Sequence, residues 1–403
     1  MSFVSDIVEQ RSELEAPIQF WTWSALTAIS AVVKDQVWLN MIDVYKLYPN
    51  IYVMLHARSG LRKGPPINLA KRLVKAVNNT QIITGRSSIQ GILKKMGESF
   101  SQPGGQIVSR STAFICSSEL SSSIVEDKAA MDILTDLYDR IYNEGEWVSL
   151  LKMESFSLKN PTVSMLVGTN AAHSDEFFSK KDVQGGYFAR TFIIYGDKRN
   201  TINSLVYPLK VPINEVESIR YLKEISKLKG EFTPLYKCEA GEYYHQWYNN
   251  FVKETEGMED ETGTLNRFGD SILKVAMLIS LGEELKLEIS IGAMKEAITH
   301  CTKLVGNMRK VTMGKRGEST FVNQKITIIK HLLKQDSFSI TRKRLLKNLS
   351  YDLNADELDA IMETFNDADQ IKTERHGNEI VYVMPQKYVA ELKDWMEGRN
   401  DRK

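Results

Sequence analysis

The sequence has little cysteine. Its 403 residues contain three cysteines, Cys116, Cys238 and Cys301, which are scattered and odd in number. That usage argues against a disulfide scaffold and favours a reducing compartment. The chain also lacks a Cys-x-x-Cys motif and any paired histidine spacing, so the sequence gives no indication of a zinc site.

A charge excess and a long apolar run are missing as well. Lys and Arg number 52 against 51 Asp and Glu, so no overall field points to a nucleic acid or a membrane, and such binding must come from local patches. Nothing approaches the run of about 20 apolar residues that crosses a bilayer. The acidic start, with Asp6, Glu9 and Glu13, is unlike a signal peptide. We therefore expect a cytoplasmic protein with no membrane partner.

What is present is an alternation of strand and helix patterns. A chain of this length suits two or three domains. Residues 14–34 are apolar nearly all round, which predicts a buried helix. The alternation ends near residue 205 and predicts a parallel sheet with helices on both faces. The expected strands lie within 36–42, 50–57, 79–83, 111–120, 156–172 and 185–197, and the clearest helices within 87–97 and 130–143.

The second half of the chain follows a different pattern. Residues 215–313 are mainly helical, and the strongest apolar stripe is "DSILKVAMLISL", residues 270–281. The Gly-containing, charged stretch 313–320 is a linker candidate. Three expected helices (321–335, 341–349 and 354–368) and two short strands around a Gly-Asn turn then predict a winged helix.

The stretch "YVMLHARSGLRKGPPINLAKRL", residues 52–73, combines a strand, a small basic turn and a helix. A phosphate loop has the pattern GxxxxGK(S/T), with Ala sometimes in the first position, and binds phosphates through backbone N–H groups, a helix N-terminus and a lysine. Two positions depart from it: Arg62 replaces the second Gly, and Gly64 replaces the hydroxyl residue that binds magnesium. A plain strand-turn-helix corner is the alternative. The candidate nucleotide-binding residues are Ala57, Ser59, Gly60, Leu61, Arg62, Lys63 and Gly64.

Polar residues follow the later strands. In such sheets, ligands bind outside the carboxyl ends of the strands. Glu119 follows "FICSS" and is a candidate general base, while Asn170 ends "VSMLVGTN" and is suited to orienting water. Arg190 follows a Gly pair and is a candidate arginine finger for a neighbouring subunit's nucleotide.

The order of these motifs resembles a family of phage and mobile-element replication proteins, phosphate-loop ATPases related to ring helicases. The resemblance covers roughly residues 14–310 and rests on "YPNIYVMLHARSGLRKG", "FICSSEL", "LYDRIYN", "LVGTN", "GGYFARTFIIY" and "NRFGDSILKVAMLISL". It implies an α/β fold: a phosphate-loop NTPase (RecA/AAA+-like) parallel sheet core with a helical lid and a C-terminal winged helix. The implied parts are an N-terminal helical segment (1–45), the ATPase core (46–205), the lid (206–315) and the winged helix (321–403).

The resemblance also implies roles and partners. Lys63 would bind the β and γ phosphates, Glu119 would activate water, Asn170 would act as sensor and Arg190 as finger. Arg267 or Lys274 would be the lid sensor that contacts the nucleotide. The implied cofactors are ATP and Mg²⁺. The implied partners are single-stranded or forked DNA, further copies of the chain in a ring of six, and other replication proteins bound through the winged helix, in the host cytoplasm if a phage encodes the chain.

The departures leave two functions open. Gly64 removes a direct magnesium ligand, and Ser118 stands where a carboxylate is usual, so Ser59, Ser117 or Ser118 with waters would have to hold the metal. Arginine is also expected to fit the loop poorly if position 62 needs a positive φ. We expect an ATP-driven DNA helicase; the alternative is a catalytically weak or inactive nucleotide-binding protein of the DNA-binding or loader type. The added winged helix disfavours a small-molecule kinase.

Each candidate also has an ordinary structural explanation. Lys63 fits a solvated turn, Glu119 a helix start and Asn170 a turn. Arg190 fits an ion pair with an acid such as Asp182 or Asp197. Arg267 and Lys274 lie seven residues apart, which also fits the solvent side of a helix.

DNA binding by the last part of the chain is not the only prediction there. The expected third helix, which usually enters the major groove, carries six acids (Asp356, Glu357, Asp359, Glu363, Asp367 and Asp369) and no base. The cations lie before it and in the wing, so DNA contact through them and docking to a protein both remain open. The candidate DNA-binding residues are Arg342, Lys343, Arg344, Lys347 and Arg375.

Overall fold

The computed structural model divides the chain into two compact units, Met1–Arg309 and Lys310–Lys403, and each is described by itself. The described residues of the first unit are 2–85, 87–97, 100–101, 107–108, 111–119, 128–139, 146–150, 155–170, 186–256 and 263–309. Those of the second unit are 310–312, 325, 328–329, 331–333, 335, 337–349, 355–377 and 379–397.

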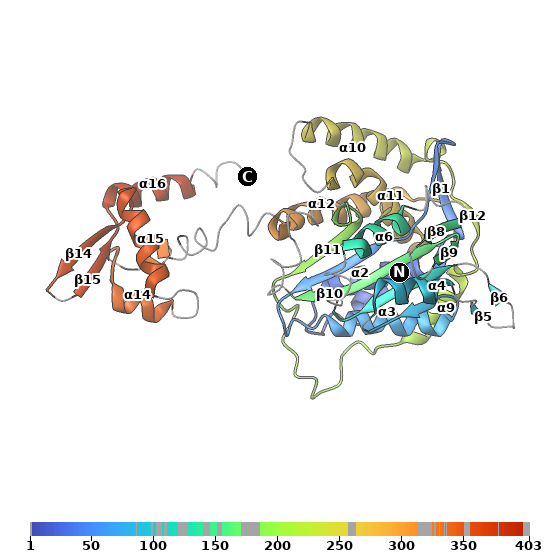
Figure 1. Ribbon diagram of the computed structural model, residues 1–403, viewed down its shortest axis with the longest axis horizontal. Helices are drawn as coiled ribbons and strands as arrows, with labels where there is room; N and C mark the ends of the chain where they lie inside the picture. The colour runs from blue at the N-terminus through green and yellow to red at the C-terminus, as the bar shows by residue number, and fades with distance from the viewer. Residues whose placement is uncertain are drawn as a thin grey trace. The chain divides into compact units, whose positions relative to one another are not determined.

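The first unit is built on a five-stranded, fully parallel sheet (Figure 1). The strand order is β11-β3-β10-β7-β4, so β10 lies between β3 and β7. This confirms the mixed α/β class and the parallel sheet. The strands are β3 (Tyr52–Ala57), β4 (Gln81–Ile83), β7 (Thr112–Ser117), β10 (Thr162–Asn170) and β11 (Thr191–Gly196).

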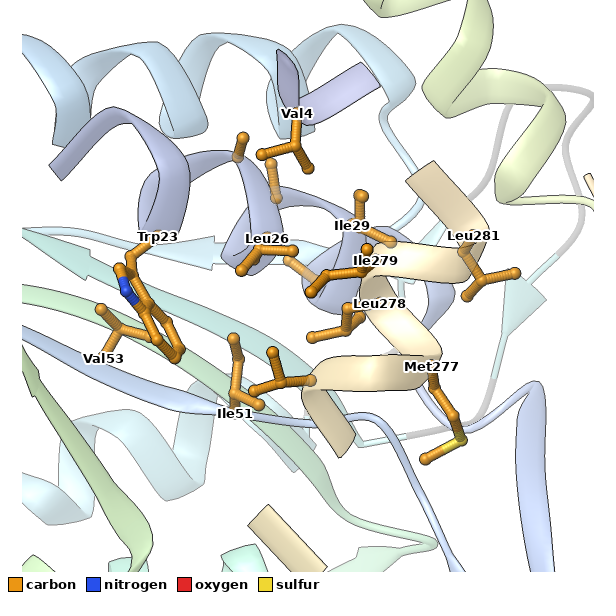
Figure 2. Packing of buried hydrophobic residues seen from close by; sticks show 14 of the residues in the cluster. Val4, Trp23, Leu26, Ile29, Ile51, Val53, Met277, Leu278, Ile279 and Leu281 are labelled. Atoms are coloured by element: carbon orange, nitrogen blue, oxygen red, sulfur yellow. The ribbon is translucent and has the colours of Figure 1, made fainter. Parts of the chain in front are cut away.

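Helix α2 (Ile18–Val33) forms the centre of the core, as its all-round apolarity predicts. Every residue from Phe20 to Val33 is buried. Figure 2 shows Trp23 of α2 beside Val53 of β3, and Ile29 beside Ile279 of α11. The short helix α1 (Phe3–Glu9), capped by Ser2, packs on the same cluster. The N-terminal segment is therefore part of the core that supports the sheet.

The two faces of β3 are covered by different helices. Val53 and Leu55 belong to the cluster around α2, which also includes α3 (Gly64–Val77). The intervening Tyr52 contacts α6 (Lys128–Tyr138): its hydroxyl donates to the carbonyl of Leu134 at 2.9 Å, and its ring lies 4.9 Å from that of Tyr138. Helices on both faces explain why these strands are continuous apolar runs.

The remaining elements of the first unit are mostly helical after β11, as expected. Helices α10, α11 and α12 lie together above the sheet in the view of Figure 1. The helices are α4 (Ile89–Gly97), α9 (Glu215–Ile225), α10 (Glu239–Thr255), α11 (Thr264–Glu283) and α12 (Ile291–Thr312), with short η3 (Phe188–Arg190) and η4 (Leu235–Lys237). The small sheet β12-β1-β2 comprises Gly230–Glu231, Val37–Met41 and Tyr45–Leu47; the hairpins are β5 (Phe100–Ser101) with β6 (Ile107–Val108) and β8 (Glu146–Leu150) with β9 (Ser155–Lys159).

The second unit has its own core around Leu345, Leu358 and Phe365. Strand β13 (Ser339–Thr341), helices α14 (Arg342–Asn348) and α15 (Ala355–Asp367), and the hairpin β14 (Lys372–His376) with β15 (Glu379–Val383) follow one another in the expected order. The sheet order is β13-β15-β14. Helix α16 (Gln386–Glu397) comes after the hairpin, where no further element was expected from the sequence.

Within the described residues, no helix is long and apolar enough to cross a membrane.

Candidate functional site

In the loop between β3 and α3, the side chain of Lys63 folds back so that its amine contacts the backbone of the same loop. The Lys63 amine donates to the carbonyls of Ala57 at 2.7 Å and Arg58 at 3.3 Å. Gly60 has φ 84°, and α3 begins directly after Lys63 with Gly64-Pro65-Pro66. Proline in the first turn suits a helix start because it has no N–H to leave unpaired. Pro65 and Pro66 carry no N–H and the Ile67 N–H donates to the Lys63 carbonyl at 3.4 Å, so the features of this turn that favour an anion are the Gly64 N–H and the dipole of the 14-residue helix.

Arg62 adopts the conformation that an arginine was expected to resist. Its φ is 54°, in the left-handed region, and Lys63 after it has right-handed helical angles. Such alternation aims successive N–H groups toward one side, as in anion-binding nests. The Arg62 Nε donates to Glu15 Oε2 at 2.8 Å, and Arg199 Nη1 donates to Glu15 Oε1 at 2.9 Å. Position 62 therefore has the positive φ that is unfavourable for arginine, and the ion pair with Glu15 supports the turn.

The strand register brings the predicted polar residues together at the carboxyl ends of the strands, which form one edge of the sheet. Asn170 pairs with Ala57, the last residue of β3, and Ser117, the last residue of β7, pairs with Val167. The next residue on β10, Gly168, lies against Ser118: a Cβ at Gly168 would collide with the Ser118 carbonyl. The turn carrying Ser118 and exposed Glu119 thus lies alongside the last residues of β10. Three strand ends meet where the loop begins.

Lys63 and Glu119 interact electrostatically across this edge. Burial lowers the pKa of the Lys63 amine, and the nearby Glu119 carboxylate partly opposes that shift. A carboxylate 56 residues further along the chain is thus close enough to the amine to influence its pKa. Lys63 is half-buried rather than a solvated turn lysine. This juxtaposition is what a bound phosphate and an attacking water would require.

The side chains at this edge do not fit a magnesium ion held by the protein. Gly64 has no side chain, and the Ser117 hydroxyl donates to the Glu119 carbonyl at 2.6 Å. Ser118 offers one neutral oxygen where Mg²⁺ favours carboxylates. No group of three His, Cys, Asp or Glu residues that could hold a metal exists among the described residues. The predicted metal role of Ser118 therefore has no supporting ligand set.

Arg190 lies at the amino ends of the strands, which form the opposite edge of the sheet. It ends η3 directly before β11, about 20 Å from the loop given the rise of a six-residue strand. Its Nε donates to Asp139 Oδ2 at 2.9 Å, its Nη2 also contacts that oxygen, and its Nη1 donates to the Gly186 carbonyl at 2.8 Å. The ion-pair partner is Asp139, not Asp197; Asp182 lies outside the described residues. Arg190 cannot reach the nucleotide of its own chain, and its role toward a neighbour stays a prediction.

Arg267 and Lys274 of α11 lie at that same far edge, which corrects the prediction that they contact the nucleotide beside Lys63. Arg267 Nη1 is 3.2 Å from Asp139 Oδ2. The Lys274 amine donates to the backbone and side-chain oxygens of Asn50, at 3.1 and 2.9 Å, and lies 3.7 Å from the Tyr138 ring centre. Lys274 is buried, so the solvent-side interpretation is wrong for it.

These residues line a pocket of about 180 Å³. Burial lowers the pKa of Lys274 to about 7, against the attraction of Asp139 and Asp270. Asp270 accepts a hydrogen bond from the Tyr45 hydroxyl at 2.9 Å, and burial raises its pKa. The chain therefore has two polar centres at opposite edges of one sheet, and only the first combines a helix N-terminus with a lysine and a carboxylate.

Two residues of these centres were not predicted from the sequence. Glu15 joins the loop to the segment after β11, and Asp139 holds both Arg190 and Arg267. Asp139 lies in the motif "LYDRIYN", which was the available signal. Glu15 lies at the polar start of the buried helix pattern and gave none, because its partners are 47 and 184 residues away.

In the second unit, one predicted DNA-binding residue is already paired. Arg342 makes two hydrogen bonds to Asp359 of α15, at 2.8 and 2.7 Å, which lower the pKa of that carboxyl. The remaining four predicted cations are exposed: Lys343, Arg344 and Lys347 on α14, and Arg375 on β14.

A comparison with protein-family models and with curated proteins finds no match for this chain. The geometry and the sequence motifs alone carry the functional argument.

Proposed function

We propose that this chain is a phosphate-loop ATPase of phage or mobile-element DNA replication that binds a nucleoside triphosphate at the turn between β3 and α3. The observation that carries the proposal is the electrostatic proximity of Lys63 and Glu119 at one edge of a parallel sheet. The buried strands β3 and β7 bring them together by pairing with β10.

The chemistry follows from those positions. The phosphates would displace the Ala57 and Arg58 carbonyls as partners of the Lys63 amine, while the Gly64 N–H at the start of α3 would donate to a phosphate oxygen. Glu119 would accept a proton from the water that attacks the terminal phosphorus, and ADP would leave. Asn170, the register partner of Ala57 on the neighbouring strand, is the residue that we propose orients the water.

The wider part of the proposal is that copies of the chain arranged in a ring use the energy of ATP hydrolysis. A nucleotide between subunits would meet the far edge of a neighbour, the edge that carries Arg190 and Arg267. Subunit movement would then drive DNA through the ring, as a helicase or translocase does. The second unit would contact DNA through α14 and β14, or dock a replication protein through acidic α15.

A second candidate has one observation in its favour. Gly64 and Ser118 leave the site without the usual magnesium ligands, which fits a protein that binds nucleotide for assembly or loading without turnover. The two candidates differ in the release of phosphate.

Turnover of ATP, with and without single-stranded DNA, separates them. We expect the wild type to release phosphate, Lys63→Ala to lose both binding and release, and Glu119→Gln to bind ATP without releasing phosphate. Lys75→Ala, an exposed lysine in the last turn of α3, is the matched control and should behave as the wild type. If the wild type binds ATP but no protein releases phosphate, the assembly role replaces the enzyme; if Lys63→Ala binds as tightly as the wild type, the site is wrong.

A further inference from the structure

Arg62 occupies a loop position with a left-handed backbone conformation. Its φ of 54° is unfavourable for any residue with a Cβ, and glycine would adopt it without cost. The chain nevertheless has arginine there. A side chain kept in a disfavoured conformation at a functional turn invites a chemical explanation.

The same loop is short of groups that hold a cation beside phosphates. Gly64 lacks the hydroxyl, Ser117 is bonded to the Glu119 carbonyl, and Ser118 is neutral. A nucleoside triphosphate carries several negative charges that must be neutralised. The turn compensates for the missing metal ligands with positive charge: Arg62 and Lys63 are adjacent, and Arg58 lies four residues before Arg62.

The partner of Arg62 permits it to move. Its side chain is 58% exposed, and its guanidinium is paired with Glu15. Glu15 has a second arginine, Arg199, on its other oxygen. When Arg62 turns away, the carboxylate therefore keeps an ion pair, so the exchange leaves no acid without a partner. The hydrogen bond from Arg62 lowers the pKa of Glu15.

We propose that Arg62 replaces a protein-held magnesium ion at this loop, so that the chain binds the metal-free form of a nucleoside triphosphate. The guanidinium moves from Glu15 to the phosphates, where its planar fork matches two phosphate oxygens. This inference rests on the proposed function, because it concerns the same site. It assigns the loop a ligand, the uncomplexed polyphosphate, that a magnesium-dependent loop binds poorly.

The competing explanation is that Arg62 only anchors the turn to Glu15. Under that explanation, removing the guanidinium changes nucleotide affinity equally with and without magnesium. Under our proposal, the loss is large only without magnesium, because a magnesium ion on the free nucleotide otherwise neutralises the same oxygens.

Calorimetric titration of the full chain with ATP, in excess magnesium and in EDTA, decides between them. The wild type should bind with affinities within about threefold in the two media, whereas Arg62→Gly should lose about tenfold or more in EDTA and much less in magnesium, the size expected for a hydrogen bond between charged groups. Glycine suits φ 54°, so this variant should fold. Lys75→Ala removes an exposed charge from the last turn of α3 and should leave the magnesium dependence as in the wild type.

A rebuilt loop supplies the converse test. In the double variant Arg62→Gly with Gly64→Ser, the added Cβ meets no heavy atom within 4 Å, and binding should become dependent on magnesium. Equal losses for Arg62→Gly in both media, or a wild type that binds only with magnesium, overturn the inference and leave the proposed function standing. A wild type that binds ATP in neither medium overturns both.

Discussion

At the scale of single residues, the charged side chains at the two edges of the sheet differ in burial and in the strength of their ion pairs. At the loop, Lys63 and Arg62 have weak or replaceable partners, whereas Asp139, Arg190 and Lys274 are enclosed by protein. A buried charge with several partners is costly to disturb. The far edge therefore contributes rigidity, and the loop keeps the exchangeable cations.

The first prediction concerns Asp139. Changing Asp139 to Asn should lower the free energy of unfolding by about 3–5 kcal/mol, because it leaves the buried Arg190 charge without its partner. Urea unfolding followed by tryptophan fluorescence measures the loss. Asp132→Asn changes an exposed acid on α6, the helix that ends directly before Asp139, and should alter that free energy by less than about 0.5 kcal/mol. Equal effects of the two substitutions would show that the Arg190 pair does not stabilise the fold.

The second prediction concerns the pH dependence due to Lys274. Its pKa is about 7 in the fold and 10.5 in the unfolded chain, so between these values the unfolded chain binds more protons. The free energy of unfolding therefore rises with pH in this window, by at most about 1.4 kcal/mol per pH unit from this group. Lys274→Met lacks that contribution. The stability of the wild type minus that of the variant should increase from pH 7 to pH 10 in urea unfolding, and a constant difference would contradict the low pKa.

The sequence predicted which polar residues lie together where a general rule about parallel sheets applied. Lys63, Glu119 and Asn170 follow strands of a parallel sheet, whose carboxyl ends gather at one edge. The prediction failed for Lys274, which was taken for a surface lysine or nucleotide sensor. The apolar residues on all sides of it in "SILKVAMLISL" indicated burial, yet its partner Asn50 is 224 residues away and has no local signature.

At the scale of elements, the junction of β7 with β10 sets the separation of Glu119 from Lys63. Gly168 allows the Ser118 backbone to lie directly on β10. Gly168→Ala should push that turn outward, reduce phosphate release by about tenfold or more and destabilise the fold by about 1–3 kcal/mol. Gly292→Ala, in α12 with only ordinary contacts, is the control for both measurements. Unchanged turnover in Gly168→Ala would mean that the position of Glu119 does not matter.

Elements whose apolar residues recur at a regular spacing could be predicted from the sequence. Elements that depend on pairing between strands far apart in the sequence could not. Apolar runs located β3, β7, β10 and β11, and a helical stripe located α2 and α11. The order that inserts β10 between β3 and β7 depends on long-range pairing, which no local pattern records. Two-residue β12 exists through its pairing with β1. Helix α16 was missed although Tyr388, Val389 and Leu392 recur at helical spacing.

At the scale of the whole molecule, the chain consists of two separately packed units joined near residue 310. The expected linker at 313–320 lies outside the described residues. Because each unit has its own buried cluster, residues 1–309 and 310–403 should each fold when expressed alone. Circular dichroism with cooperative thermal melting of each piece is the measurement. We expect ATP binding to stay with 1–309 at the affinity of the full chain, and its loss would show that the second unit completes the site.

The DNA-binding part of the proposal also belongs to this scale. Removing one cation that binds a DNA phosphate should reduce the dependence of log affinity on log salt concentration by about one unit. Replacing Lys343 and Arg344 with Ala should therefore lower DNA affinity and that slope together, whereas Lys387→Ala, exposed on α16, serves as the control. A slope identical to that of the wild type would favour the docking of a protein by this unit.

The central claim is that a triphosphate binds where Lys63 and Glu119 meet. A crystal structure of the chain with a non-hydrolysable ATP analogue tests it most directly. We expect the terminal phosphate within hydrogen-bonding distance, about 3 Å, of the Lys63 amine and on the Glu119 side of the loop. An analogue bound instead in the Tyr138–Lys274 cavity, with the Lys63 amine still on the Ala57 and Arg58 carbonyls, would contradict it.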